Sequence, residues 1–552
     1  MSTLDRRIGF LFAAFLLLFA LAFGRALELG TIQRGHLTRV AATQQVSTDV
    51  VLARRGTIVD RHGVGLAISE PAGDVSATPY LIKDPATVAK RLAPILNQPE
   101  GAIVTKLVQR NTGFVYLRRE LPAAGADRIK AMKIEGITVT DSQLRTYPHD
   151  MLASQVIGMV GTDHIGLSGL EYSRNSLLAG SNGKVRTVRD GHGQPISVQA
   201  PQQTHQGAKL ELTIDASIQD KAEQVLKAVG AKYTPKFATA IVMDPRSNEI
   251  LALANWPRVD ANNPEGAPTA AQQDHAVGTD FEPGSTFKAF TVAGALSDGT
   301  ITPDTRFDLP PTIKIADRTI GEAEVRPDVT LTTAQILQQS SNVGAIKIGL
   351  TLGRDRFDNW VHRFGFGKQT GVDLPGEEQG QVLHANQYSG ASMGNLPIGQ
   401  GLSVTALQMA TAYSAIANGG ILRRPHVVRR INGHLVPEPR GRRIISPQVS
   451  AQLRSMLEGV LAPGGTASEV SIPPYKLAGK TGTANKIDRK TGKYSTTNYD
   501  ASFVGFAPAS HPRLLVAVVV DEPRGDFYGG TVAAPAFGDI ARFALPYLRI
   551  AP

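Results

Sequence analysis

Two serine–lysine pairs with a spacing of three residues are the first candidates for chemistry in this chain of 552 residues, which contains no cysteine. A serine hydroxyl becomes a nucleophile when a nearby base takes its proton, and a lysine can be that base when burial lowers its pKa. The pairs are Ser181-Asn182-Gly183-Lys184 and Ser285-Thr286-Phe287-Lys288. Average composition produces about one or two such pairs by chance in a chain of this length, so the spacing alone does not identify a site.

The surrounding residues separate the two pairs. Ser181 lies in a turn-like segment that would not hold the two side chains together. Ser285 precedes an apolar stretch from Phe287 to Leu296, which predicts a buried helix. Residues three apart share a face of a helix, so Lys288 would stand one turn from Ser285, and the helix N-terminus would favour a developing alkoxide. A surface serine and lysine remain the alternative for either pair.

Two further motifs, Ser-x-Asn and Lys-Thr-Gly, also occur twice each. The copies are Ser173-Arg174-Asn175 and Ser340-Ser341-Asn342, and Lys480-Thr481-Gly482 and Lys490-Thr491-Gly492. The last copy lies in a charged run typical of a hairpin tip, whereas the copy at Lys480 suits a strand on which Gly482 would let a ligand approach the backbone. Strict alternation puts Lys480 and Thr483 on opposite faces, so both can line a cleft only if the strand is twisted or lies at a sheet edge.

The elements that would position these motifs mix strand-like and helix-like patterns, which indicates an α+β fold with a sheet flanked by helices. Two apolar runs, Ala238–Met243 and Glu249–Ala254, flank the turn residues Pro245–Asn248 and predict a hairpin. Helices are expected over Thr333–Leu350 and Val404–Asn418, a strand over Arg513–Val520, and a closing helix over Pro535–Leu545 with proline in its first turn.

The N-terminus predicts a membrane anchor. Residues Ile8–Gly24 carry no charge and would span about 25 Å as a helix, slightly less than the ~30 Å hydrocarbon core, and the segment can extend to Leu27. Arg6 and Arg7 precede it, which predicts that the short N-terminal tail lies in the cytoplasm and that most of the chain lies outside it. A cleaved signal peptide is the alternative, because Ala20-Leu21-Ala22 mimics a cleavage site, but the apolar run is longer than usual for one.

Composition excludes several classes of site. The absent thiols remove cysteine nucleophiles, cysteine-rich zinc sites, iron–sulfur clusters and disulfides. The 12 histidines are scattered and show no ligand cluster, so neither a metal nor a cofactor is expected. The net charge of +10 allows an anionic partner but names none. The polar stretch Arg55–Gly63 and the residues Arg145 and Glu171 are interpreted as turns and ion pairs, because no nucleophile–base pair accompanies them.

One ordered set of motifs remains, at Ser285, Ser340 and Lys480, with separations of 55 and 140 residues. This set, and the residues around it, resembles the class B penicillin-binding proteins, most closely their FtsI-like cell-division type. The resemblance also includes Phe281–Lys288, Gln338–Gly344, Gly479–Ala484, Tyr528–Gly530 with Ala534-Pro535, Arg55–Gly63 (with His62 where asparagine is common) and Gly169-Leu170-Glu171. It therefore covers nearly the whole chain.

The resemblance implies a domain order and a set of site residues. The expected parts are a cytoplasmic tail (1–7), a transmembrane anchor (8–27), a non-catalytic pedestal of the dimerisation type (28–207) and a penicillin-binding transpeptidase domain of the serine β-lactamase-like fold (208–552), with an antiparallel sheet flanked by helices. The implied catalytic residues are Ser285, Lys288, Ser340 and Lys480, and the implied substrate-binding residues are Asn342, Thr481, Gly482 and Thr483.

The resemblance also implies an activity and partners. Ser285 would attack the D-Ala-D-Ala end of a peptidoglycan stem peptide, an amine of a second stem peptide would complete the cross-link, and β-lactams would acylate Ser285. An FtsW-like membrane glycosyltransferase and other divisome proteins are the implied partners at a bacterial inner membrane, and no nucleic acid is expected. An elongation-type transpeptidase is the main alternative, and a membrane-anchored β-lactam hydrolase or sensor is a weaker one.

Overall fold

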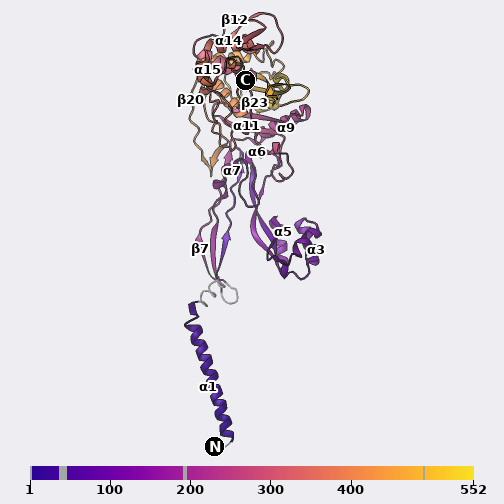
Figure 1. Cartoon of the computed structure of the whole chain (residues 1–552), viewed down its shortest axis with the longest axis vertical. Coiled ribbons are helices and arrows are strands. Elements are labelled where there is room, and N and C mark those ends of the chain that lie inside the picture. The colour runs from indigo at the N-terminus through magenta and orange to yellow at the C-terminus, as the bar shows by residue number, and fades with distance from the viewer. Residues whose placement is uncertain (1–2, 36–45, 190–194, 489–490) are drawn as a thin grey trace. The chain divides into compact units, whose positions relative to one another are not determined.

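The computed structural model describes residues 3–35, 46–189, 195–488 and 491–552 (Figure 1). The chain forms two compact units, the first made of Met1–Arg55 with Ala179–Gly207 and the second of Gly56–Leu178 with Ala208–Pro552. The expected division of the chain at residue 207 stays a prediction.

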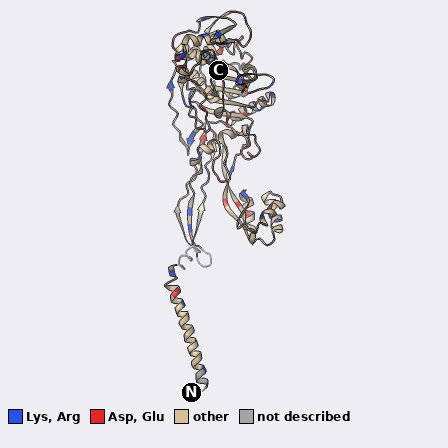
Figure 2. Cartoon of the chain, viewed as in Figure 1, with Lys and Arg blue, Asp and Glu red and all other residues tan. Residues whose placement is uncertain are grey.

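The first unit contains the apolar N-terminal helix α1 (Thr3–Gly30). Its segment Arg7–Gly30 is 24 residues long and has no buried part, and Figure 2 shows that the middle turns of α1 carry no charge. At 1.5 Å per residue this segment measures about 36 Å, enough to cross a bilayer. The helix extends past the uncharged run, where Arg25 Nη1 contacts Glu28 Oε2 at 2.6 Å one turn away.

The remainder of the first unit is an antiparallel sheet of three strands in the order β1-β6-β7. Its strands are β1 (Val46–Val51), β6 (Gly183–Arg189) and β7 (Pro195–Gln202). Lys184 of the first serine–lysine pair lies on β6, and the backbone of Ser181 pairs with that of His205.

The second unit is built around an antiparallel sheet of five strands in the order β10-β9-β23-β22-β21. The expected hairpin is confirmed by the antiparallel pairing of β9 and β10, and the expected strand at 513–520 by β23. The strands are β9 (Phe237–Asp244), β10 (Glu249–Trp256), β21 (Ala478–Ile487), β22 (Tyr494–Ala507) and β23 (Leu514–Asp521).

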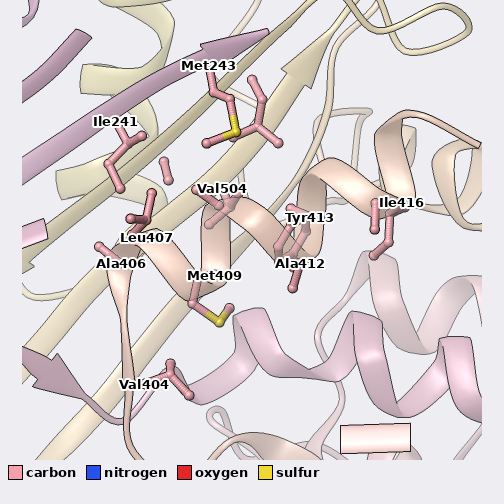
Figure 3. Packing of buried hydrophobic residues seen from close by; sticks show 14 of the residues in the cluster. Ile241, Met243, Val404, Ala406, Leu407, Met409, Ala412, Tyr413, Ile416 and Val504 are labelled. Atoms are coloured by element: carbon pink, nitrogen blue, oxygen red, sulfur yellow. The ribbon is translucent and has the colours of Figure 1, made fainter. Parts of the chain in front are cut away.

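Both faces of this sheet are buried, because helices cover each of them. Alternate residues of β23 belong to different hydrophobic cores, with Leu515 and Val519 in one and Val516 and Val518 in the other. Helix α17 (Ala406–Ala417) packs on the first face, where Figure 3 shows its residues beside Ile241 and Met243 of β9 and Val504 of β22. Helices α9 (Ala216–Tyr233) and α19 (Gly529–Tyr547) cover the second face.

A seven-stranded sheet joins the N-terminal part of the second unit to its C-terminal part, because β8 pairs with β2 on one side and with β18 on the other. Helices α3, α4 and α5 pack together with β3 and β4 over a separate small core. The elements are β2 (Ile58–Val59), β3 (Gly65–Ala77), β4 (Val115–Pro122), β5 (Ile137–Thr146), β8 (Leu210–Leu212), β18 (Val428–Ile431), β19 (His434–Leu435), α3 (Pro85–Leu96), α4 (Glu100–Leu107), α5 (Ala123–Met132), α6 (Ser154–Ile157), α7 (Gly169–Ser173) and α8 (Asn175–Ala179).

The polar residues of the N-terminal half have the structural contacts expected of them. Arg145 donates through Nε to Glu171 Oε1 at 2.7 Å, and both side chains are buried. The Asp60 carboxylate accepts hydrogen bonds from the backbone N–H groups of His62, Val64 and Ala216, the last being the first residue of α9. The Arg55–Gly63 stretch therefore binds the N-terminus of helix α9 through Asp60.

Two helix predictions need correction. The expected helix Thr333–Leu350 is two helices, α13 (Thr333–Gln338) and α14 (Asn342–Leu352), because Ser340 between them has a φ of +60°.

The closing helix α19 starts at Gly529, so Pro535 is not in its first turn. Because proline has no N–H, Pro535 cannot donate the helical hydrogen bond to the carbonyl of Thr531, four residues earlier. The Tyr233 hydroxyl donates to this carbonyl instead, at 3.2 Å.

The remaining elements of the second unit are two-stranded sheets and helices of at most 12 residues. The paired strands are β11 (Asp280–Phe281) with β16 (Val404–Thr405), β12 (Arg306–Leu309) with β15 (Val329–Thr332), β13 (Thr312–Ile315) with β14 (Arg318–Gly321), and β17 (Ile421–Leu422) with β20 (Arg442–Arg443). The helices are η1 (Pro79–Leu81), α10 (Thr269–Gln272), α11 (His275–Gly278), η2 (Gly284–Phe287), α12 (Lys288–Ser297), α15 (Arg354–Arg363), η3 (Ala385–Gln387), α16 (Ser392–Asn395), η4 (Leu396–Ile398) and α18 (Pro447–Glu458).

Candidate active site

Ser285 lies in the short 3-10 helix η2, which leads directly into the buried helix α12. The preceding Gly284 has a φ of +53°, and a Cβ there would lie 2.8 Å from the carbonyl oxygen of Thr483. Gly284 also donates its N–H to the carbonyl of Gly399 at 3.0 Å. Glycine is therefore required before Ser285, because it lets η2 lie against β21 and leaves the serine side chain half-buried at the start of α12.

Lys288, one turn further on, is fully buried at the first position of α12. Its Nζ donates to the carbonyl oxygen of Ser340 at 2.6 Å, to Asn342 Oδ1 at 2.7 Å and to Ser340 Oγ at 3.3 Å. Burial lowers the pKa of Lys288 to about 7; Glu322 opposes this shift and Arg326 adds to it. A neutral amine is therefore accessible near neutral pH, as a general base requires.

Ser340 and Asn342 meet Lys288 because the chain turns sharply between α13 and α14. The left-handed conformation of Ser340 directs both its carbonyl and its hydroxyl at Lys288 Nζ. Asn342 is the first residue of α14, and its Nδ2 donates to the carbonyl of Gly321 at 2.9 Å. The amide oxygen of Asn342 is therefore held toward the lysine.

Glu322 fixes the start of α14 from outside the motif. Its carboxylate, which is 7% exposed, accepts hydrogen bonds from the backbone N–H of Asn342 at 2.6 Å and from Ser341 Oγ at 2.6 Å. Arg326 donates to this carboxylate at 2.5 Å and to Ser341 Oγ at 2.9 Å. A carboxylate at a helix N-terminus is stabilised by the unpaired N–H groups there, so Glu322 and Arg326 support the residues that contact Lys288.

Lys480, Thr481, Gly482 and Thr483 lie on β21, which is the edge strand of the five-stranded sheet. Lys480 is fully buried, and burial together with the nearby Lys288 charge lowers its pKa well below the usual value. Its Nζ donates to Thr481 Oγ1 at 3.3 Å. Strict alternation would put Lys480 and Thr483, three residues apart, on opposite faces of the sheet. At a sheet edge both side chains can line the same cleft.

Gly482 and the C-terminal helix complete the contacts around β21. A Cβ at Gly482 would lie 2.8 Å from the carbonyl of Pro283 and 2.8 Å from Thr286 Cγ2, so η2 packs directly on this glycine. Thr483 Oγ1 accepts the backbone N–H of Gly529, the first residue of α19, at 3.0 Å. The Lys480–Gly482 motif and the adjoining Thr483 thus contact both the η2 segment that carries Ser285 and the Tyr528–Gly530 segment.

The structure brings the eight expected site residues together on η2, α12, the α13–α14 turn and β21. It does not pair Ser285 with Lys288: among the described residues, the lysine donates to Ser340 and Asn342 instead. Of the duplicate motifs, Ser173 donates to the carbonyl of Asp373 at 3.3 Å, away from Lys288. Lys490 lies outside the described residues.

Glu322 and Arg326 were missed by sequence reasoning. They belong to the segment between β14 and β15, stand four positions apart and match no motif. The two side chains do form an i,i+4 ion pair, but this spacing is a recognised signal only in a helix, and the segment is not one. Only the fold shows that the segment reaches the N-terminus of α14.

Comparison with known proteins gives the family of this chain. The family model "Penicillin binding protein transpeptidase domain" matches residues 238–542, and "Penicillin-binding Protein dimerisation domain" matches residues 50–212. The chain is 32% identical to the probable peptidoglycan D,D-transpeptidase PenA of Neisseria gonorrhoeae, over 100% of this chain and 94% of PenA. It is 32% identical to the peptidoglycan D,D-transpeptidase FtsI of Escherichia coli, over 99% and 92%.

A solved structure has the same fold. It is penicillin-binding protein 3 of Mycobacterium tuberculosis, complexed with aztreonam, and it superposes with a TM-score of 0.72 at 29% identity over 91% of this chain and 98% of that one. The two family models together span most of the chain, and the relatives align over nearly its full length. The chain therefore belongs to the class B penicillin-binding proteins, with a dimerisation domain followed by a serine transpeptidase domain.

Proposed function

We propose that this chain cross-links peptidoglycan at the division septum, with Ser285 as its nucleophile. As a class B penicillin-binding protein it is a serine-type peptidoglycan D,D-transpeptidase that binds β-lactams. The septal role and the residue assignments are our proposal. The observation that carries the assignments is the buried Lys288, whose Nζ contacts both residues of the second motif while η2 holds Ser285 one turn away.

Acylation follows from these positions. Neutral Lys288 takes the proton of Ser285 as Oγ bonds to the carbonyl carbon of the penultimate D-alanine. The bond from this carbon to the nitrogen of the terminal D-alanine then breaks, and the proton passes through Ser340 Oγ, which lies 3.3 Å from Lys288 Nζ, to the leaving amine. An acyl-enzyme and free D-alanine result. General base catalysis of this kind typically contributes roughly 10²–10⁴-fold.

Substrate binding falls to β21 and Asn342. The terminal carboxylate of the donor peptide would lie against Lys480, Thr481 and Thr483, and its charge would favour the ammonium form of the buried Lys480. Asn342 would hold a peptide amide of the donor, and Gly482 would keep the strand free of a side chain. The amine of a second stem peptide then attacks the acyl carbon, which restores Ser285 and forms the cross-link.

Labelling with a fluorescent penicillin tests the nucleophile. Membranes containing the wild-type chain should show a stable labelled band, and Ser285→Ala should show none. Ser181→Ala is the matched control, since it alters the other serine–lysine pair, and it should label like the wild type. Labelling that survives in Ser285→Ala would reject the assignment, and loss of the label within seconds would favour a hydrolase.

The septal role is supported by the full-length similarity to FtsI, and α1 is consistent with a single-pass anchor. A fluorescent fusion to the cytoplasmic N-terminus should concentrate at midcell in dividing cells, and depletion should produce filaments. Localisation along the side wall, with loss of rod shape on depletion, would instead assign the elongation role. Co-purification with an FtsW-like glycosyltransferase would support the proposed membrane partner.

A further inference from the structure

Three ligand-type side chains meet at a place that the transpeptidase chemistry does not use. Asp358 and His362 lie one turn apart on α15, and His384 immediately precedes η3. One ligand atom of each lies within 4.8 Å of those of the other two. The sequence predicts no histidine cluster because 22 residues of chain separate His362 from His384 and no common spacing connects them. The fold alone brings them together.

The distances between the ligand atoms suit a tetrahedral cation. His362 Nε2 is 3.1 Å from Asp358 Oδ1, and His384 Nδ1 is 3.9 Å from Asp358 Oδ2. Zinc binds histidine nitrogen and carboxylate oxygen at about 2.0–2.2 Å, which places neighbouring tetrahedral ligand atoms about 3.3–3.6 Å apart. A small inward shift of the His384 ring would give that geometry.

The groups around the cluster orient two of the three ligands. His362 Nδ1 lies 3.2 Å from the carbonyl of Phe366, so this nitrogen carries a proton and donates it. The lone pair of the neutral ring is then on Nε2, which is buried and has no hydrogen-bond partner among the described residues. Tyr388 donates its hydroxyl to Asp358 Oδ1 at 3.4 Å. Such outer contacts are typical of metal-binding histidines and carboxylates.

His362 Nε2 lies 3.1 Å from Asp358 Oδ1 but makes no hydrogen bond to it or to any other described residue, so its lone pair is available to a cation. We propose that Asp358, His362 and His384 form a structural Zn²⁺ site, with water as the fourth ligand. Imidazole and carboxylate ligands suit Zn²⁺ better than they suit Mg²⁺ or Ca²⁺.

His384 is the adaptable ligand. Its ring accepts the backbone N–H of Gln387 in the cap of η3, and its side chain is 66% exposed. Metal binding exchanges this solvent-accessible hydrogen bond for a coordinate bond. The rings of His362 and His384 already lie 4.3 Å apart, centroid to centroid.

The site would join α15 to residues 364–391, a stretch whose only described helix is η3. Helix α15 in turn packs on α12, which begins at Lys288, and Trp360 of α15 donates to Asp298 at 3.0 Å. Zinc would therefore stabilise α15, which packs on α12, without contacting Ser285 or Lys288.

The test uses the full-length chain in detergent, stripped with a chelator and titrated with Zn²⁺ alone. We expect one equivalent to bind, a higher melting temperature, and strong visible absorption when Co²⁺ replaces Zn²⁺, as tetrahedral Co²⁺ produces. His384→Gln should weaken Zn²⁺ binding at least tenfold, and Tyr388→Phe about tenfold. His434→Gln, which removes an exposed histidine on β19, is the matched control and should bind like the wild type.

Fluorescent penicillin labelling checks that each variant is folded, because His384 and Tyr388 lie outside the proposed catalytic residues. Zn²⁺ binding that is absent in the wild type, or equal in wild type and His384→Gln, overturns the proposal. Normal labelling of His384→Gln together with lost Zn²⁺ binding supports the site, and this outcome is independent of the proposed septal role.

Discussion

The ammonium of Lys288 donates to Asn342 Oδ1 at 2.7 Å, so the first and second motifs are already joined before any substrate arrives. The backbone N–H of the same asparagine donates to Glu322 at 2.6 Å. Asn342 therefore connects Lys288, the proposed general base, to the buried carboxylate of Glu322. The protonation of Lys288 and the position of α14 are consequently coupled.

The rate of acylation should depend on pH through Lys288. Because its pKa is lowered to about 7, the lysine is protonated below that value and cannot accept the Ser285 proton. We expect the second-order rate of penicillin acylation to fall about tenfold for each pH unit below 7 and to level off above it. Stopped-flow or quenched labelling across a pH series measures this profile. A rate that stays constant down to pH 5 would contradict the role of Lys288.

Substitutions at Glu322 and Arg326 should move this profile in opposite directions. The charge of Glu322 raises the pKa of Lys288 and that of Arg326 lowers it. Glu322→Gln should therefore shift the acid limb to lower pH, and Arg326→Gln should shift it to higher pH. Glu324→Gln, an exposed residue of the same segment, is the control and should leave the midpoint in place. Shifts of the same sign in both variants would contradict the electrostatic explanation.

Gly482→Ala should separate the nucleophile from β21. The added Cβ would lie 2.3 Å from Ser502 Oγ, 2.8 Å from the carbonyl of Pro283 and 2.8 Å from Thr286 Cγ2. The Ser502 side chain can rotate, but the backbone carbonyl of Pro283 cannot, so the segment that leads into η2 must move. A misplacement of about 1 Å can cost roughly 10²-fold in rate, and we expect a loss of that order in acylation by penicillin. Gly101→Ala, where a Cβ would meet no atom within 4 Å, is the control. Unchanged kinetics in Gly482→Ala would mean that η2 does not depend on this contact.

Breaking the buried ion pair of the N-terminal half should destabilise the second unit. Glu171→Gln leaves Arg145 charged and buried, which typically costs about 3–5 kcal/mol. We expect a lower melting temperature and faster proteolysis at the β3–β5 sheet. Glu135→Gln removes an exposed partner 3.9 Å from Lys83 and should leave both measurements unchanged. Equal melting temperatures for the two variants would contradict a structural role for the Arg145–Glu171 pair.

The candidate site was easier to propose from the sequence than the elements around it. Motifs such as Ser285–Lys288 and Lys480–Gly482 consist of three or four consecutive residues. Their residue types and order can therefore be recognised from the sequence, without knowledge of the fold. The break at Ser340 was missed because a single left-handed residue does not disturb the apolar periodicity of 333–350. The start of α19 was misplaced because the hydroxyl that compensates Pro535 comes from Tyr233, 302 residues earlier in the chain.

Contacts between distant segments explain what remained hidden. Glu322 and the Asp358–His362–His384 cluster depend on which loop reaches which helix end, and residue spacing carries no such information. The edge position of β21 could be stated only as a condition for Lys480 and Thr483 to act together. The strand order of the folded sheet meets that condition.

An edge strand has one row of backbone N–H and C=O groups that no neighbouring strand satisfies. In the proposed function, an extended stem peptide would bind to this row on β21 through its own main chain. Recognition of this kind depends on backbone direction and on the stereochemistry of each residue more than on large side chains. It suits a cell-wall peptide whose two terminal D-alanines have only methyl side chains.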